Sequence, residues 1–241
     1  MVDHNPEPSP QSTAMLEWHD GDMPYSRAFD DHFYCRSDGR LECGHVFLAG
    51  NGLPRRWHQP GHFRIGELGF GTGLNFCETW RQWRSAAPAG ACLHFTSFEL
   101  FPMRADDIGR ALSHWPEIER ERAALLDAWP ENPEGRITIA LAPDIRLTVV
   151  CGAALAGLLA EESCFDAWFL DGFAPARNPE MWSAELMAAV FRHTVPGGSF
   201  STYAAAGFVR RNLLAAGFTV ERRAGFAGKR EMLCGTRPAA D

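Results

Sequence analysis

Apolar and polar residues follow two patterns along most of the chain, one typical of strands and one typical of helices. Short apolar runs that predict buried strands cover residues 62–70, 93–100, 146–152, 165–173 and 197–204. Helical spacing of apolar residues covers residues 73–85, 104–115, 118–129, 154–162, 179–194 and 207–217. A closing pair of strands is predicted at residues 218–224 and 230–236. Because strands alternate with helices, we expect an α/β fold with a doubly wound, mostly parallel sheet.

The first 63 residues carry a different pattern. The segment MVDHNPEPSPQSTAM is polar and rich in proline, so residues 1–15 are predicted to form a disordered tail. Residues 33–50 contain two alternating apolar runs around Ser37-Asp38-Gly39, which predicts a β-hairpin. We therefore expect residues 16–63 to form a β-hairpin extension within one globular domain, joined to a Rossmann-like core over residues 64–241.

The composition narrows the functional classes. With 46% hydrophobic and 22% charged residues and no apolar stretch of about eighteen residues, the 241-residue chain is predicted to be globular and to have no membrane segment. Seven cysteines without a Cys-x-x-Cys pair, and no signal-peptide pattern, favour a reducing cytoplasm. Pro60 and Gly61 separate His58 from His62, so no metal site is expected. A net charge of −7 argues against coating nucleic acid by charge alone but allows a local basic patch.

A glycine-rich loop follows the first predicted core strand. Gly69, Gly71 and Gly73 alternate as Gly-x-Gly-x-Gly, whereas a dinucleotide fingerprint has its third glycine one place later. Glu67 precedes the loop, and its charge would repel a pyrophosphate but suit a cationic ligand such as S-adenosylmethionine. Glu99 ends the next strand, where a carboxylate can accept hydrogen bonds from ribose hydroxyls. The loop predicts a nucleoside cofactor; the alternative is a plain turn with solvated carboxylates.

A second carboxylate ends a central apolar strand. Asp171 follows Trp-Phe-Leu and should lie beside the glycine loop, where a methyl acceptor would sit. A carboxylate there can orient an amine and take its proton, and Phe173 can stack on a base. The alternative is that Asp171 caps a helix, the role we expect for Asn178 before Pro179.

Several long segments resemble one family. They are FDDHFYC, HVFLAGNGLPRRW, ELGFGTGLNF, DAWFLDGFAPARNPEMW, PGGSFSTYAAAGFVRRNLLAAGF and GFAGKREML. Together they resemble the methyltransferase domain of the MnmC/MnmD family over about residues 16–235. The resemblance implies a Rossmann-like methyltransferase that uses S-adenosylmethionine to methylate the 5-aminomethyl group of 5-aminomethyl-2-thiouridine at the tRNA wobble position. By its motifs, the resemblance implies that Glu99 contacts the cofactor ribose and that Asp171 faces the acceptor amine. The residues that it places on the cofactor loop are Glu67, Gly69, Gly71, Gly73 and Asn75.

The chain departs from this family pattern in two places. Cys151-Gly152-Ala153 stands where the family has a Gly-Asp pair, so the acid that contacts adenine is expected to be missing. The bifunctional members continue into an FAD-dependent oxidase domain, whereas this chain shows no second glycine fingerprint before Asp241. A separate oxidase is therefore a possible partner.

Basic residues that could contact an RNA anticodon loop form three clusters. Lys229 and Arg230 lie in a matching motif and are expected near the substrate. Arg55 and Arg56 precede the first core strand, and the helical pair Arg210–Arg211 is interpreted as solvated surface.

Two other functions remain open. One is a methyl- or aminopropyltransferase that acts on a small amine, and the other is a non-catalytic Rossmann-like RNA-binding module. A nicotinamide dehydrogenase is disfavoured by the glycine spacing and by the absence of a lysine four residues after Tyr203.

Overall fold

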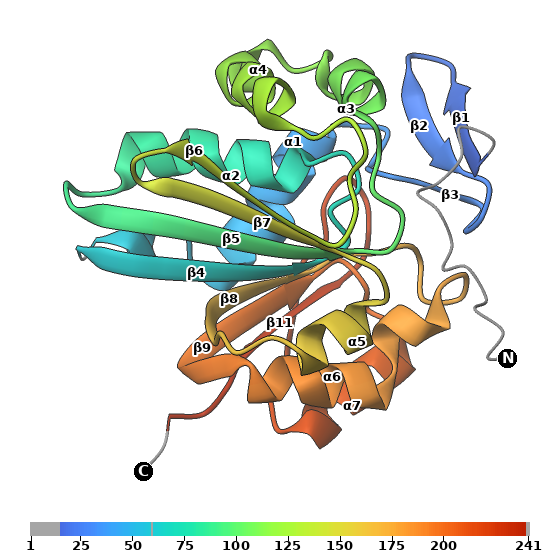
Figure 1. Cartoon of the computed structure of the whole chain (residues 1–241). Helices are drawn as coiled ribbons and strands as arrows, with labels where there is room; N and C mark the ends of the chain where they lie inside the picture. The colour runs from blue at the N-terminus through green and yellow to red at the C-terminus, as the bar shows by residue number, and fades with distance from the viewer. Residues whose placement is uncertain (1–14, 59, 240–241) are drawn as a thin grey trace, which may run out of the picture.

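An eight-stranded sheet forms the centre of the protein, for which a computed structural model describes residues 15–58 and 60–239 (Figure 1). Its strand order is β10-β11-β9-β8-β4-β5-β7-β6. The bounds are β4 Gly61–Leu68, β5 Ala91–Glu99, β6 Arg136–Ala142, β7 Ile145–Cys151, β8 Phe165–Leu170, β9 Thr194–Thr202, β10 Glu221–Arg223 and β11 Met232–Thr236.

The central strands run parallel and the edges run antiparallel. Strand β4 pairs in parallel with β5 on one side and β8 on the other, and β7 and β9 extend the parallel region. Strand β6 pairs antiparallel with β7, and β11 pairs antiparallel with both β9 and β10. The strand order reverses at β4, and a doubly wound sheet binds its ligand at the carboxyl ends on either side of such a switch point.

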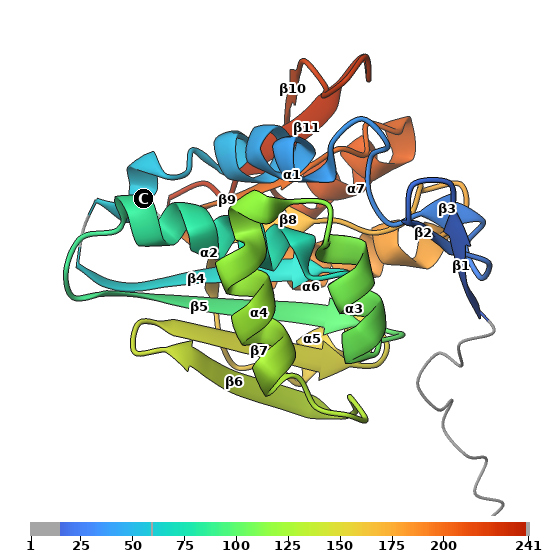
Figure 2. The ribbon, with the colours of Figure 1, turned by 90° about the horizontal axis from the view of Figure 1, so that it is seen from above.

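Helices cover both faces of the sheet. Figures 1 and 2 show α1 to α4 on one face and α5 to α7 on the other. Their bounds are α1 Gly39–Glu42, α2 Leu74–Ala86, α3 Ala105–Leu112, α4 Glu119–Ala128, α5 Ala154–Leu159, α6 Ala184–Arg192 and α7 Gly207–Ala216. Each face has its own apolar core: Ile65 and Phe95 point into the first, and Leu68 and Trp168 into the second. The alternating pattern of the sequence thus predicted the doubly wound α/β fold correctly.

The predicted hairpin at residues 33–50 is wrong. This segment is helical, with α1 followed by a π-helical stretch at Cys43–Leu48 and a 3-10 turn at Ala49–Asn51. Asp38 does not form a turn but caps α1, accepting a hydrogen bond from the Leu41 N–H at 3.0 Å. Cys43, Val46 and Phe47 lie on one buried helical face. The prediction of alternating strands overlooked this helical spacing.

The N-terminal extension does contain a hairpin, but earlier in the chain. Strands β1 Leu16–His19, β2 Met23–Ser26 and β3 Asp31–His32 form a small antiparallel sheet. In both ribbon views this sheet lies beside α3 (Figures 1 and 2). Arg110 of α3 holds it there, because its Nε donates to Asp22 at 2.9 Å and its guanidinium lies over the Trp18 ring. The expected tail covers residues 1–15, of which residues 1–14 lie outside the described residues.

Two further details differ from expectation. Strand β6 was not predicted. Pro179 does not begin a long helix: a 3-10 turn covers Pro179–Trp182, and Ser183 then caps α6 through the Leu186 N–H. Asn178 occupies the N-cap position of the 3-10 turn without a capping side-chain hydrogen bond, which corrects its expected role.

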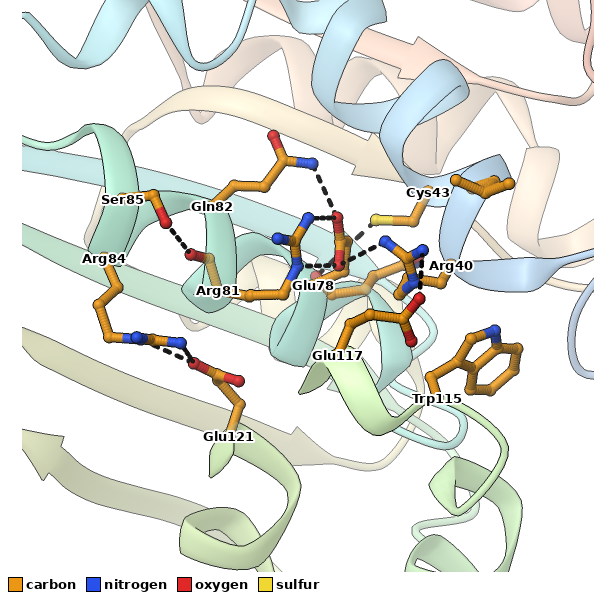
Figure 3. A network of polar contacts seen from close by, with 12 residues as sticks. Arg40, Cys43, Glu78, Arg81, Gln82, Arg84, Ser85, Trp115, Glu117 and Glu121 are labelled. Atoms are coloured by element: carbon orange, nitrogen blue, oxygen red, sulfur yellow. Dashed lines mark hydrogen bonds and ion pairs between the residues drawn. The ribbon is translucent and has the colours of Figure 1, made fainter. Parts of the chain in front are cut away.

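A buried ion network fastens the helices above the sheet to one another (Figure 3). Glu78 of α2 has a side chain 2% exposed and accepts hydrogen bonds from Arg81 and Gln82. Arg40 of α1 lies 3.6 Å from Glu78 and 3.0 Å from Glu117, which begins the segment leading to α4. One carboxylate on α2 therefore joins α1 to the body of the domain.

Within the described residues, no helix combines the length and apolar composition needed to cross a bilayer. The same residues contain no group of three or more histidine, cysteine or acidic side chains placed to hold a metal ion.

Candidate active site

A cavity of about 410 Å³ opens at the carboxyl ends of β4, β5 and β8. Its floor comes from the loops after these strands, through residues such as Gly71, Glu99 and Asp171. Its roof comes from residues 31–36 of the N-terminal extension. The cavity therefore lies at the switch point of the sheet and is closed by a segment that precedes the core in the chain.

The glycine loop needs its glycines for their backbone conformation. Gly69, Gly71 and Gly73 have φ angles of +88°, +53° and +77°, a region that other residues rarely adopt. At Gly69 a Cβ would lie 3.5 Å from the carbonyl oxygen of Asp171, and at Gly73 it would lie 2.9 Å from the Phe70 ring. Gly69 and Gly71 line the cavity, while Gly73 is buried beneath it as the N-cap of α2.

Glu99 fixes the loop from the adjacent strand. Its Oε2 accepts the Gly71 N–H at 2.9 Å, and its Oε1 accepts the Phe101 N–H at 2.8 Å. Burial raises the pKa of this carboxyl above its ordinary value, while the backbone N–H groups act to lower it. Glu99 thus presents an ordered carboxyl to the cavity at the position where ribose hydroxyls can donate.

Asp171, Asn75 and Glu67 form one chain of hydrogen bonds. The amide of Asn75 donates to Asp171 Oδ2 at 2.9 Å and to Glu67 Oε1 at 3.0 Å. The backbone N–H of Gly172 donates to Asp171 Oδ1 at 2.8 Å, and the Ser97 hydroxyl donates to Glu67 at 2.7 Å. Both carboxyls are therefore held in fixed orientations by the same amide.

The two carboxyls differ in their access to the cavity. Asp171 lines it, and burial raises the pKa of Asp171 to about 7. Glu67 has no exposed surface and does not line the cavity; burial raises its pKa well above the ordinary value. The enclosed Glu67 carboxyl lies outside the cavity lining, so it does not face a cationic ligand there as expected from the sequence. It instead lies behind Asn75 and supports it.

The predicted substrate residues are only partly brought together. Phe173 lines the cavity, where it stacks on Phe29 with centroids 4.6 Å apart. Lys229 also lines it; its Nζ lies 2.7 Å from Glu42 and 4.3 Å from the Tyr203 ring centroid. Arg230 is exposed and lies outside the cavity wall.

Sequence reasoning missed the residues that close the cavity. Asp31 accepts the Ala174 N–H at 3.0 Å and so joins β3 to the loop after Asp171. The Tyr203 hydroxyl donates to the Gly172 carbonyl on the other side of that loop. The dense aromatic and acidic segment FDDHFYC was the available signal, but nothing local in it indicates contact with a loop 140 residues later.

Arg56 makes hydrogen bonds within the protein, and Ala153 lies at the surface. The Arg56 guanidinium donates to Ser199 Oγ at 2.6 Å and to the Asp166 carbonyl at 2.9 Å, so it is a structural residue and not a free phosphate contact. Ala153 is an exposed residue before α5, and the Gly152 N–H beside it donates to the Glu99 carbonyl at 2.8 Å.

The fold and the cavity define an α/β protein with a ligand cavity at the switch point of its sheet. A profile of the S-adenosyl-L-methionine-dependent methyltransferase family matches residues 116–238, about half of the chain. The chain belongs to this family, and S-adenosyl-L-methionine is its cofactor.

Similar proteins share one name. The chain is 44% identical over 238 residues to the "tRNA 5-methylaminomethyl-2-thiouridine biosynthesis bifunctional protein MnmC" of Chromohalobacter salexigens, covering 95% of this chain and 34% of that protein. It is 46% identical over 227 residues to the protein of the same name from Pseudomonas aeruginosa, covering 92% and 35%. The chain thus spans about a third of the length of these relatives.

The fold is also found among solved structures. The crystal structure of MNMC2 from Aquifex aeolicus matches with a TM-score of 0.74 at 22% identity, covering 98% of this chain and 73% of that one. This match independently supports the Rossmann-like methyltransferase fold.

The residues of the cavity fit S-adenosyl-L-methionine. Glu99 lines the cavity with carboxyl oxygens that could accept hydrogen bonds from ribose hydroxyls, and the glycine loop lets a ligand approach the backbone. Acidic side chains also suit the positive sulfonium and amino groups: Asp31 and Asp171 line the cavity, whereas the charge of Lys229 is offset by Glu42. No carboxylate stands at Ala153, so the adenine would be held by backbone and apolar contacts.

Proposed function

We propose that this chain methylates the primary amine of 5-aminomethyl-2-thiouridine at the wobble position of tRNA. The observation that carries the proposal is Asp171, an oriented carboxyl with a pKa of about 7 in the wall of the cofactor cavity. The name that these relatives share supports the choice of substrate. With this role the protein would act in the cytoplasm.

Asp171 is suited to an amine acceptor. When bound, S-adenosyl-L-methionine supplies an electrophilic methyl group, and an amine can attack it only through a free lone pair. The ionised Asp171 accepts a hydrogen bond from the amine N–H, which orients the lone pair, and it then takes the proton that the nitrogen loses. A pKa near 7 suits this role, because the group is substantially ionised at neutral pH and still binds a proton.

The surroundings of Asp171 are suited to a nucleobase. Phe173 offers a ring at the cavity wall, and aromatic rings stack on bases that are turned out of an RNA loop. Lys229 lies at the same wall, paired with Glu42, and its ammonium group can donate a hydrogen bond to the substrate. The amine itself would come from an FAD-dependent oxidase, in a separate protein or a further domain.

The test compares substrates. The protein is incubated with labelled S-adenosyl-L-methionine and either tRNA that carries the aminomethyl group, tRNA that lacks it, or free polyamines. The proposal predicts label in the wobble nucleoside of the first tRNA alone. Label in free polyamines but not in tRNA would assign the protein to small-amine alkyl transfer and overturn the proposal.

A further inference from the structure

A second cavity, of about 200 Å³, lies on the sheet face that α5 to α7 cover only in part. It is formed by the first halves of β4, β5 and β7 together with β6, away from the strand ends that form the cofactor cavity. The apolar residues of this face, such as Leu68 and Phe98, lie at the carboxyl ends of the strands and pack beside Leu158 of the short helix α5. The first halves of the strands carry polar side chains instead.

Positive side chains stand in register across three adjacent strands of this face. Arg64 of β4 pairs with His94 of β5, and His94 pairs with Arg146 of β7. In the next row toward the carboxyl ends, Thr96 pairs with Thr148, and both are almost fully buried. The two guanidinium groups thus lie on either side of His94, where their like charges disfavour a positive charge on the imidazole.

The charges in the row are not neutralised by the protein itself. Within residues 15–58 and 60–239, neither Arg64 nor Arg146 has a carboxylate within 4.0 Å of its guanidinium or a side-chain hydrogen bond. Arg136 also lines the cavity and is paired with Glu161 at 2.9 Å. The carboxylate of Asp166 accepts the backbone N–H of Arg64 at 2.7 Å.

The positive groups around His94 affect its pKa. Its ring centroid lies 4.9 Å from that of His62. Burial lowers the pKa of His94, and His62, Arg146 and Arg64 lower it further through their positive charges. A protein of net charge −7 thus maintains a positive, hydroxyl-lined cavity on an open face of its sheet.

We propose that this cavity is a binding site for a phosphate group, in which Arg64 and Arg146 hold the anion against the hydroxyls of Thr96 and Thr148. Guanidinium groups match the geometry of phosphate oxygens, and hydroxyls complete the donor set. The phosphate belongs either to the backbone of a bound RNA or to free phosphate. The site stands apart from the cofactor cavity and does not depend on the proposed methylation.

The experiment compares the double variant Arg64→Gln/Arg146→Gln with the wild type. A matched control is Arg210→Gln/Arg211→Gln, which removes the same charge from α7. Thermal unfolding is measured in sodium phosphate and in sodium chloride at equal ionic strength. Affinity for an unmodified tRNA transcript is measured at several salt concentrations, and S-adenosyl-L-methionine binding confirms that each variant is folded.

The wild type and the α7 control should be stabilised by phosphate relative to chloride, and the double variant should lose that difference. If RNA supplies the phosphate, the double variant also binds tRNA at least about tenfold more weakly. The slope of log affinity against log salt concentration then falls by the equivalent of about two phosphate contacts. Unchanged tRNA affinity with lost phosphate stabilisation assigns the site to free phosphate. A double variant that matches the wild type with both ligands overturns the proposal. Methyl transfer to the aminomethylated tRNA reports separately on the proposed function.

Discussion

At the scale of single residues, the central feature is that one amide, Asn75, orients two carboxyls, the half-buried Asp171 and the fully buried Glu67. Asp171 faces the cavity, and Glu67 lies behind it without exposed surface. Burial is the main cause that raises the pKa values of both carboxyls. Each carboxyl therefore makes the free energy of unfolding depend on pH.

The first prediction concerns stability and pH. The folded-state pKa of Asp171 lies at about 7, above its ordinary value of 3.8, so the folded protein binds more protons than the unfolded chain between these values. Stability attributable to Asp171 is therefore lost as pH rises from about 4 to about 7. Asp171→Asn removes this loss, so urea unfolding should show the variant gaining on the wild type over that range. A constant difference between them would contradict the assignment.

The second prediction separates the shape of Glu67 from its charge. Burial raises the pKa of this carboxyl and so favours its uncharged form, so Glu67→Gln should retain the fold, with near-normal S-adenosyl-L-methionine affinity. Glu67→Ala removes one of the two acceptors of Asn75 and the acceptor of Ser97, and it should cost about 2–4 kcal/mol of stability, with weaker cofactor binding. Chemical denaturation and calorimetry measure both. Equal damage in the two variants would show that the negative charge matters.

The third prediction concerns Glu99. Replacing it by glutamine removes one of two acceptors for the loop N–H groups and weakens the bonds offered to ribose hydroxyls. Cofactor affinity should fall by about 10–100-fold, since hydrogen bonds to a charged group contribute about 1.5–3 kcal/mol. The exposed Glu185→Gln of α6 is the control in the same calorimetric titration. An unchanged dissociation constant for Glu99→Gln would remove Glu99 from the cofactor site.

At the scale of elements, local pattern predicted the core well because each core element buries a regular face. Strand β8, for example, is apolar at nearly every position because helices cover both sides of the sheet. The N-terminal segment was predicted poorly for the opposite reason. Residues around Cys43 and Val46 fit a short strand or a helical turn equally well, and packing against α2 decides between them. Strand β6 alternates half-buried and exposed positions at a sheet edge, which leaves a weak signal.

The fourth prediction tests how α1 is attached to α2. Glu78→Ala leaves Arg40 and Arg81 facing a buried position without their carboxylate, which should cost about 3–5 kcal/mol. Glu119→Ala breaks the exposed pair with Arg122 and should cost less than about 1 kcal/mol. Thermal and chemical unfolding of the two variants provide the comparison. Similar losses would mean that burial does not set the strength of these pairs.

At the scale of the whole molecule, the cofactor cavity is completed by parts that are distant in the sequence. The extension supplies the roof through Asp31 and Phe33, the core supplies Glu99 and Asp171, and the region before the last strand supplies Lys229. Sequence patterns located the core residues because they sit at strand ends, where topology fixes their neighbours. They could not locate the roof, since its position depends on packing between segments with no shared period.

The most direct test of the account is transfer of a trideuterated methyl group from S-adenosyl-L-methionine to aminomethylated tRNA at pH 7, read by mass spectrometry of the wobble nucleoside. The wild type should add one labelled methyl group to that nucleoside. Asp171→Asn, with the cofactor saturating, should be about 10²–10⁴-fold slower because it cannot take the amine proton. No labelled wobble nucleoside with the wild type, or equal rates for the two proteins, would contradict the account.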